Sequence, residues 1–249
     1  MFRATLSEGK MLKSSMEAIS NMIDEACLIA TQEGVRLRAM DPAHVALVDF
    51  QLKREIFDIY ELDKEQCFIG LDLNRFYTIL KRAGASSKLS LEVLEDANLL
   101  RIRFSGDSST RMFSIPLIEI TEEELRVPKL EFPCLVEIDP AILKEGIKDA
   151  EIVSDHVTFS VDDENFYISA RGELGEVEIK VGKEGAMSFE VKEHAKSMFS
   201  IEYLRDMLRA SDIASTVKIY LGNNIPVKLE FSSTGVELSF LLAPRIEAE

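Results

Sequence analysis

The chain has 249 residues, of which 44 are acidic and 29 basic, so its formal net charge is −15. Its composition, 46% hydrophobic and 29% charged, is that of a globular protein. No apolar run approaches the roughly 18 residues that span a bilayer, and the N-terminal residues do not have the apolar core of a signal peptide. Taken alone, the acidic charge argues against a nucleic-acid partner, because DNA binding normally requires a basic surface.

Four segments have the spacing of apolar residues that predicts amphipathic helices of about three turns. In the first, Leu12, Met16 and Ile19 fall on one face, and charged side chains fall on the other. The third begins with Asp139 and Pro140, an N-cap residue followed by proline at the first helical position. The four predicted helices are residues 9–21, 72–83, 139–150 and 200–211.

Most of the remaining sequence alternates between apolar and polar residues, which predicts short strands. Turn-forming sequences such as Gln32-Glu-Gly34 separate these segments. We therefore expect antiparallel hairpins rather than parallel strands joined by crossover helices. The clearest predicted strands are residues 45–52, 99–104, 216–221 and 236–241.

The second half of the chain repeats the pattern of the first. A shift of 131 positions aligns residues 12–41 with residues 143–172 without a gap, and a shift of 128 positions aligns the second predicted helix with the fourth. Such a repeat predicts two copies of one module of about 130 residues. We expect an α+β protein with an N-terminal module (residues 1–117), a connector (118–133) and a C-terminal module (134–249).

Positive charge is concentrated on the predicted helices. The four segments together carry a net charge of +2, which leaves −17 for the rest of the chain. Exposed lysine and arginine are often just the solvated face of a helix, but four helices on one side of the sheets would form a strip suited to non-specific phosphate contact. The basic residues of these faces are Lys10, Lys13, Lys81, Lys144, Lys148, Arg205 and Arg209, with Arg82 at the margin.

Five segments resemble one family in sequence, order and spacing. They are Ile23-Asp-Glu-Ala-Cys27, Met40-Asp-Pro-Ala-His-Val45, Ile79-Leu-Lys-Arg-Ala-Gly84, Gly172-Glu-Leu-Gly175 and Leu242-Ala-Pro-Arg-Ile-Glu247. Along nearly its whole length the chain resembles the DNA sliding clamp of archaea and eukaryotes, the proliferating cell nuclear antigen family. The length also suits that family, which has two modules per chain and closes a ring from three chains.

The resemblance implies that the four helices line the channel of a trimeric ring and that the sheets form its outer wall. Duplex DNA is expected to thread the channel without sequence preference, while the clamp tethers DNA polymerase and makes it processive. Lys13, Lys81 and Arg209 fall at or beside basic lining positions of the family. A clamp loader is a further expected partner, as are a flap endonuclease and a DNA ligase through a short peptide motif.

The resemblance also implies a groove for that peptide, whose single helical turn would enter an apolar pocket beneath the connector. A flexible methionine side chain can pack against different inserted side chains, and extended segments of the protein offer backbone hydrogen bonds to the peptide. Without the resemblance, Met40, Val45 and Leu47 are ordinary strand-core residues. The matching residues are Met40, His44, Val45, Leu47, Leu125, Val127, Pro128, Pro226, Leu241, Leu242, Ala243 and Pro244.

Residues 110–117 and 176–182 match the two strands that pair between neighbouring subunits of the family. Such pairing completes a continuous sheet and removes an exposed sheet edge. Arg82 and Arg111 are expected to add ion pairs with acidic residues of the third helix, such as Asp149. The expected interface residues are Arg82, Arg111, Phe113, Ile115, Glu176, Glu178 and Lys180.

An enzyme is the main alternative class, and the sequence argues against it. It has no HExxH, GxSxG, GxGxxG or CxxC motif, so no catalytic residue, metal site or cofactor is expected. A subunit of a heterotrimeric or checkpoint-type clamp is a second alternative. Scattered Cys27, Cys67 and Cys134 indicate a reducing compartment, which is the cytoplasm with its nucleoid in an archaeon or the nucleus in a eukaryote.

Overall fold

The computed structural model describes residues 1–84, 87–106, 108–120, 125 and 129–246. Contacts between residues divide the chain into two compact units. Unit 1 comprises Met1–Met40, Val48–Leu125 and Ser233–Leu238, and unit 2 comprises Asp41–Leu47, Arg126–Ser232 and Ser239–Glu249. Each unit therefore includes one short segment from the distant half of the sequence.

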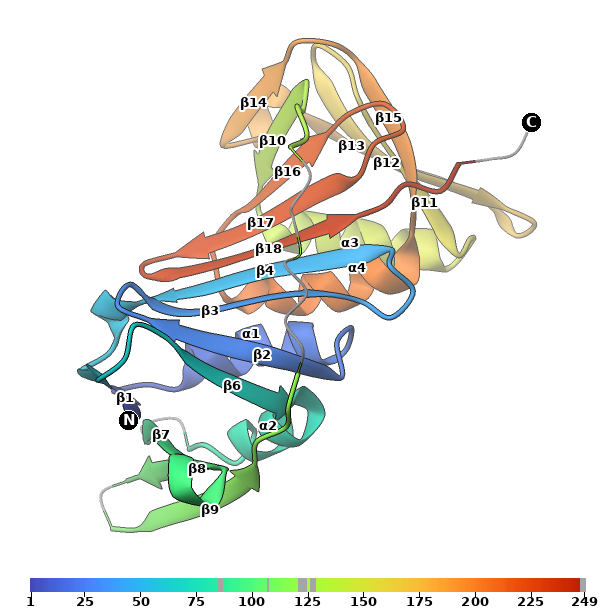
Figure 1. The fold of residues 1–249 in the computed structure, drawn as a ribbon. Coiled ribbons are helices and arrows are strands. Elements are labelled where there is room, and N and C mark those ends of the chain that lie inside the picture. Colours follow the sequence, from blue (N-terminus) through green and yellow to red (C-terminus); the bar gives the residue numbers. More distant parts are fainter. Residues whose placement is uncertain (85–86, 107, 121–124, 126–128, 247–249) are drawn as a thin grey trace. The chain divides into compact units, whose positions relative to one another are not determined.

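The first half of the chain begins with a strand and a helix, and along the chain further strands precede and follow a second helix (Figure 1). Its elements are β1 (Phe2–Leu6), α1 (Lys10–Ser20), β2 (Glu25–Thr31), β3 (Gly34–Met40), β4 (Ala46–Lys53), the 3₁₀ turn η1 (Arg54–Ile56), β5 (Ile59–Leu62), β6 (Cys67–Asp72), α2 (Leu73–Leu80), β7 (Lys88–Leu94), η2 (Glu95–Ala97), β8 (Leu99–Ser105) and β9 (Thr110–Pro116).

The second half repeats the same order of strands and α-helices. Its elements are β10 (Cys134–Ile138), α3 (Pro140–Glu151), β11 (His156–Val161), β12 (Asn165–Gly172), β13 (Gly175–Gly182), η3 (Lys183–Gly185), β14 (Ser188–Val191), β15 (Ala195–Ser200), α4 (Ile201–Met207), η4 (Leu208–Asp212), β16 (Val217–Leu221), β17 (Val227–Ser233) and β18 (Val236–Leu242).

The order of strands within the sheets confirms the predicted duplication. In the first half the strands are ordered β5-β1-β7-β8-β9 and β4-β3-β2-β6, and in the second half the equivalent strands are ordered β14-β10-β16-β17-β18 and β13-β12-β11-β15. The pairs β1·β7, β7·β8 and β11·β12 are antiparallel, as the predicted hairpins require. The α+β fold with two repeated modules is therefore confirmed.

Aspartate caps begin two of the helices. The carboxylate of Asp72 accepts a hydrogen bond from the amide of Arg75, and that of Asp139 accepts one from the amide of Ala141, each at 2.8 Å. Both bonds satisfy amides that have no partner within the helix. Pro140 occupies the first helical position, where its missing N–H costs nothing.

The fourth predicted helix is only partly α-helical. The segment 200–211 forms α4 as far as Met207 and continues as the 3₁₀ turn η4. The amide of Ile213 donates to the carbonyl of Ala210 at 2.9 Å, an i to i+3 bond that satisfies a terminal carbonyl by tightening the last turn. Within the described residues no helix is long and apolar enough to cross a membrane.

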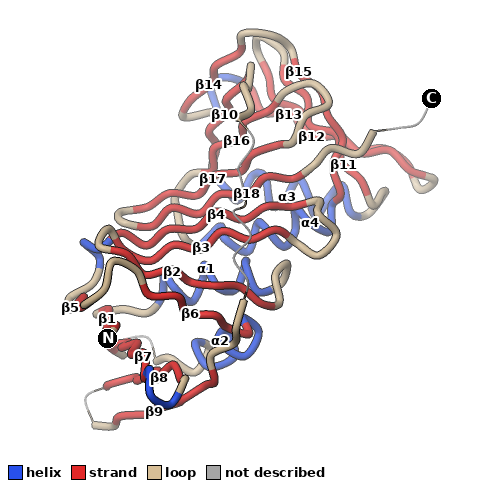
Figure 2. The backbone as a smooth tube through the Cα atoms, viewed as in Figure 1, coloured by secondary structure: helices blue, strands red, loops and turns tan. Residues whose placement is uncertain are grey.

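Strands make up most of both units, with the helices as minor elements (Figure 2). Along the strands, buried residues alternate with more exposed ones, so each sheet has an apolar face and a polar face. Phe2, Phe76 and Phe104 are completely or almost completely buried in unit 1, as are Phe159 and Phe199 in unit 2. The helices add their apolar sides to these cores and leave basic side chains exposed.

We expect Gly34→Ala to destabilise unit 1 strongly. Gly34 has φ +135°, and a Cβ atom there would lie 2.0 Å from the carbonyl oxygen of Leu52. Gly175 has φ +138° with nothing within 4 Å of its Cβ position, so Gly175→Ala isolates the backbone strain. Denaturant unfolding should give a loss of about 1–3 kcal/mol for Gly175→Ala and clearly more for Gly34→Ala. Equal losses would contradict the steric account.

Candidate functional site

The basic residues on the helices of unit 1 have no carboxylate partners among the described residues. Lys10 and Lys13 lie on α1, where Lys10 is exposed and Lys13 half-buried. Lys81 and Arg82 directly follow α2 and are both exposed, and the ammonium of Lys81 lies 4.8 Å from the ring centroid of Tyr77. Their charges are therefore available to an external anion.

Most of the basic residues on the helices of unit 2 are paired with carboxylates, either on the next turn or on the neighbouring helix. Lys144 is exposed without such a partner within the described part of the chain. The ion pairs of the others are Lys148 with Glu145 at 2.6 Å, Arg205 with Glu151 at 2.9 Å and Arg209 with Asp206 at 3.2 Å. Exposed pairs of this kind are weak and exchangeable, but each has no net charge, so a distant anion meets little attraction from it. The sequence windows agree, since the two of the first module carry +3 and those of the second −1.

A buried carboxylate organises the loop that carries several of the predicted groove residues. Asp41 is only 3% exposed. Its oxygens accept hydrogen bonds from the amides of Ala43 at 3.1 Å, Val45 at 2.7 Å and Ala46 at 2.6 Å, and from the hydroxyl of Tyr203 at 2.7 Å. The loop is thereby held in a turn in which His44 adopts φ +58° and remains exposed.

The pKa values of Asp41 and Tyr203 both favour the hydrogen bond between them. Burial is the largest influence on Asp41 and disfavours its charge, but the four hydrogen bonds together outweigh burial and lower its pKa. Burial, and then the hydrogen bond to Asp41, raise the pKa of Tyr203 to about 12. At neutral pH a charged carboxylate therefore accepts from a protonated phenol, which is the stronger kind of hydrogen bond.

The segment directly after β18 lies beside this loop. The amide of Ala243 donates to the carbonyl of Val45 at 2.9 Å. Among the predicted groove residues of unit 2, His44 is exposed, and Val45, Pro226, Ala243 and Pro244 are half-buried. Leu47, Leu241 and Leu242 are 4%, 8% and 0% exposed, so these three support the loop from the core instead of presenting open surface.

The remaining predicted groove residues belong to other segments. Met40 ends β3 in unit 1 and is half-buried. The carbonyl of Leu125 accepts a hydrogen bond from Nη1 of Arg38 at 3.5 Å. Val127 and Pro128 lie outside the described residues.

Both strands predicted at the subunit interface lie at the edge of a sheet. β9 ends the order β5-β1-β7-β8-β9, and β13 ends the order β13-β12-β11-β15. Arg111 is exposed, Phe113 is half-buried, and Ile115 is only 5% exposed because it lies opposite Leu100 on the apolar face. The side chain of Ile115 therefore packs in the core of unit 1, although β9 itself is an edge strand. On β13, Glu176, Glu178 and Lys180 are all exposed.

The described residues hold no group of three or more His, Cys, Asp or Glu side chains that could bind a metal ion. Cys27, Cys67 and Cys134 form no disulfide bond with one another. The role of Asp41 was not predicted, although aspartate followed by proline is a turn signal, and an amide two residues later is its usual partner. Nothing in the sequence indicated Tyr203, because it is 162 positions away.

Models of one family match the two parts of the chain. Residues 1–124 match the model described as proliferating cell nuclear antigen, N-terminal domain, and residues 126–246 match that of the C-terminal domain. Together they leave only a few residues unmatched.

Similar proteins carry related names. The DNA polymerase sliding clamp of Methanococcus vannielii is 38% identical over 253 residues and covers 100% of both chains. DNA polymerase sliding clamp 1 of Thermococcus kodakarensis is 39% identical over 249 residues, with 99% of each covered. A crystal structure of PCNA from Thermococcus kodakaraensis has a TM-score of 0.92 and 31% identity, covering 98% of this chain and 100% of that one.

We expect Tyr203→Phe to lower the free energy of unfolding by about 1–3 kcal/mol at neutral pH, because Asp41 loses one of its donors. Because the pKa of Asp41 is lower in the folded than in the unfolded state, its charged form stabilises the folded protein at pH values above the unfolded-state pKa. That stabilisation is lost as the pH falls through the folded-state pKa. The difference in the free energy of unfolding between Tyr203→Phe and the wild type, measured by urea titration, should therefore become smaller as the pH falls below about 4.

Tyr167→Phe is the matched control, since it removes the hydroxyl that donates to Asp162 at 2.9 Å, outside the loop of residues 41–46. Asp162 is only half-buried, whereas Asp41 is almost fully buried, so a smaller loss is expected. A Tyr203→Phe deficit that stays constant with pH would contradict the role given to Asp41.

Proposed function

The chain belongs to the proliferating cell nuclear antigen family of sliding clamps, and from that premise we propose that it forms a trimeric ring around duplex DNA and tethers DNA polymerase to it. The observation that carries the proposal is the positive charge on α1 and directly after α2, which has no carboxylate partner among the described residues of a protein of net charge −15. Nothing in the fold or in the relatives' names favours a checkpoint-type clamp.

The repeat supports ring closure by strand pairing. β9 is the repeat equivalent of β18, and β13 is the equivalent of β4. The equivalents are hydrogen-bonded beside both their ends, since Lys53 N–H donates to the Gly235 carbonyl at 2.8 Å and Ala243 N–H donates to the Val45 carbonyl at 2.9 Å. The same pairing between β9 of one chain and β13 of the next would satisfy both free edges. Exposed Arg82 and Arg111 are the proposed ionic supplement.

The helices supply weak, delocalised contacts to the DNA backbone. Phosphate contacts without base contacts give binding that is independent of sequence, and a ring held by its topology needs no tight grip. Because most basic residues of unit 2 are neutralised, Lys10, Lys13, Lys81 and Arg82 of unit 1 provide most of the attraction, with Lys144, Lys148, Arg205 and Arg209 contributing less.

The loop of residues 41–46 and the segment after β18 form the described part of a groove for partner peptides. Val45, Ala243 and Pro244 offer partly exposed apolar surface. Polymerase, flap endonuclease and ligase would each insert a hydrophobic plug there, which suits a scaffold that binds partners in turn without chemistry of its own. A clamp loader would open the ring, and the protein would work inside the cell with the genome.

We expect the double variant Lys13→Glu, Lys81→Glu to reduce polymerase processivity on a primed circular template in the presence of a clamp loader. The slope of DNA retention against salt should fall by about two for each chain of the ring that contacts the DNA, since each chain loses two phosphate contacts. The variant Lys148→Glu, Arg205→Glu changes the same number of charges in unit 2 and should have the smaller effect. Both should keep a molar mass of three times 28.0 kDa. Equal effects would refute the assignment to unit 1.

We expect Val45→Asp to weaken binding of a labelled peptide with the motif Gln-x-x-hydrophobic-x-x-aromatic-aromatic by at least about tenfold, because a charge would enter an apolar contact. Fluorescence anisotropy measures the affinity. Val191→Asp, at a half-buried position of β14, is the matched control and should bind normally. Unchanged affinity in Val45→Asp would remove the groove from this loop.

A further inference from the structure

The polar face of the sheet β5-β1-β7-β8-β9 carries two cross-strand rows that the sequence patterns did not indicate. One row alternates in charge and consists of Glu61, Arg3, Glu92 and Arg101. The next row consists of Ile59, Thr5, Ser90, Arg103 and Met112, in which Arg103 is the only charge. The face therefore has excess positive charge in an otherwise acidic protein.

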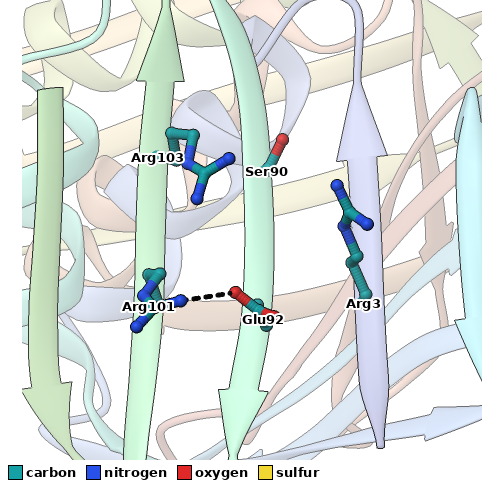
Figure 3. A pocket seen from close by; sticks show the side chains of 5 residues that line it. All are labelled: Arg3, Ser90, Glu92, Arg101 and Arg103. Carbon is teal, nitrogen blue, oxygen red and sulfur yellow. Dashed lines mark hydrogen bonds and ion pairs between the residues drawn. The ribbon is translucent and has the colours of Figure 1, made fainter. Parts of the chain in front are cut away.

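Three arginines surround a hollow of about 210 Å³ on this face, together with Ser90 and Glu92. Figure 3 shows the guanidinium groups of Arg3 and Arg103 on either side of Ser90, reaching in from β1 and β8. Arg101 instead reaches across to Glu92, with 3.0 Å between Nη1 and Oε2. The one carboxylate of the hollow is thus already engaged.

The other two guanidinium groups have no partner in the part of the chain that the structure describes. Arg3 and Arg103 make no hydrogen bond or ion pair within the described residues, although both are half-buried. Nε of Arg101 is buried without a hydrogen-bond partner as well. Half-buried guanidinium groups bind carboxylates and phosphates strongly, because their planar forks match two oxygens at once.

We infer that this face is a docking surface for an acidic, extended segment of a partner protein, with one carboxylate seated between Arg3 and Arg103 above Ser90. Arg101 and Arg103 are two residues apart on β8, which is the spacing at which alternate side chains of an extended peptide face one surface. The surface goes beyond the proposed clamp function, and it is separate from the groove at residues 41–46.

The flanking side chains favour a peptide over a nucleic acid. Met112 is 57% exposed and Ile59 is 38% exposed at the two ends of the row of Arg103, so apolar side chains of a peptide would find contacts there. A nucleic-acid strand would bring further phosphates against Glu61 and Glu92. Ring closure through the edge of β9 leaves this face uncovered, because strand pairing uses backbone groups in the plane of the sheet.

The test measures anisotropy of a fluorescein-labelled peptide of alternating glutamate and leucine against the full chain. We expect binding that weakens by about tenfold in Arg3→Ala and in Arg103→Ala, the loss expected for a charge-assisted hydrogen bond. Arg36→Ala, which removes an exposed charge on β3, should leave the affinity unchanged. Val45→Asp should also leave it unchanged, which separates this surface from the groove.

Charge exchange provides a second measurement. The double variant Arg3→Glu, Arg103→Glu should lose the acidic peptide and gain a peptide of alternating lysine and leucine. A peptide of alternating glutamine and leucine is the neutral control for the acidic peptide. If the wild-type protein bound it as tightly as the acidic peptide, the proposal would be overturned. Equal losses of affinity for the acidic peptide in Arg36→Ala and Arg103→Ala would also overturn it. So would a labelled oligothymidylate whose binding depends on Arg3 and Arg103, if binding of the acidic peptide does not depend on them.

Discussion

The unpaired backbone at two strand edges is the constraint on which the proposed assembly depends. A sheet edge presents amide and carbonyl groups that pair with another strand or with water, and β9 and β13 each leave one such edge. Their repeat equivalents β18 and β4 are hydrogen-bonded beside both ends. In the proposed ring the same strand-pairing geometry would be used once within the chain and again between chains. Only a closed ring would turn weak DNA contacts into lasting retention.

Charge is distributed so that those contacts stay weak. The basic residues of α1 and the end of α2 have no carboxylate partners in the described structure, whereas three of the four in unit 2 are paired with acidic neighbours. The duplicated modules have kept the same order of strands and helices but not the same electrostatics. A polyanion therefore meets moderate attraction from one module and little from the other, which favours sliding over tight binding.

The sequence predicted the elements and the duplication because both depend on local patterns. Apolar spacing located all four α-helices, and Asp139 was a recognisable cap because capping acts within one turn, whereas the cap at Asp72 was not predicted. The 3₁₀ turn after Met207 was not predicted, since a period of three or of 3.6 fits so short a segment equally well. The ion pairs that neutralise Arg205, the bond from Tyr203 to Asp41 and the arginines around Ser90 depend on residues brought together by the fold, which no local pattern contains.

The hydrogen bond between Tyr203 and Asp41 also has a consequence in time. During synthesis Asp41 leaves the ribosome long before Tyr203, and Val45 long before Ala243, so a growing chain holds this loop with its own amides alone. The loop belongs by its contacts to unit 2, although it is encoded in the first fifth of the sequence. Nascent and truncated chains that stop at the connector would therefore lack the two hydrogen bonds that Tyr203 and Ala243 donate to this loop.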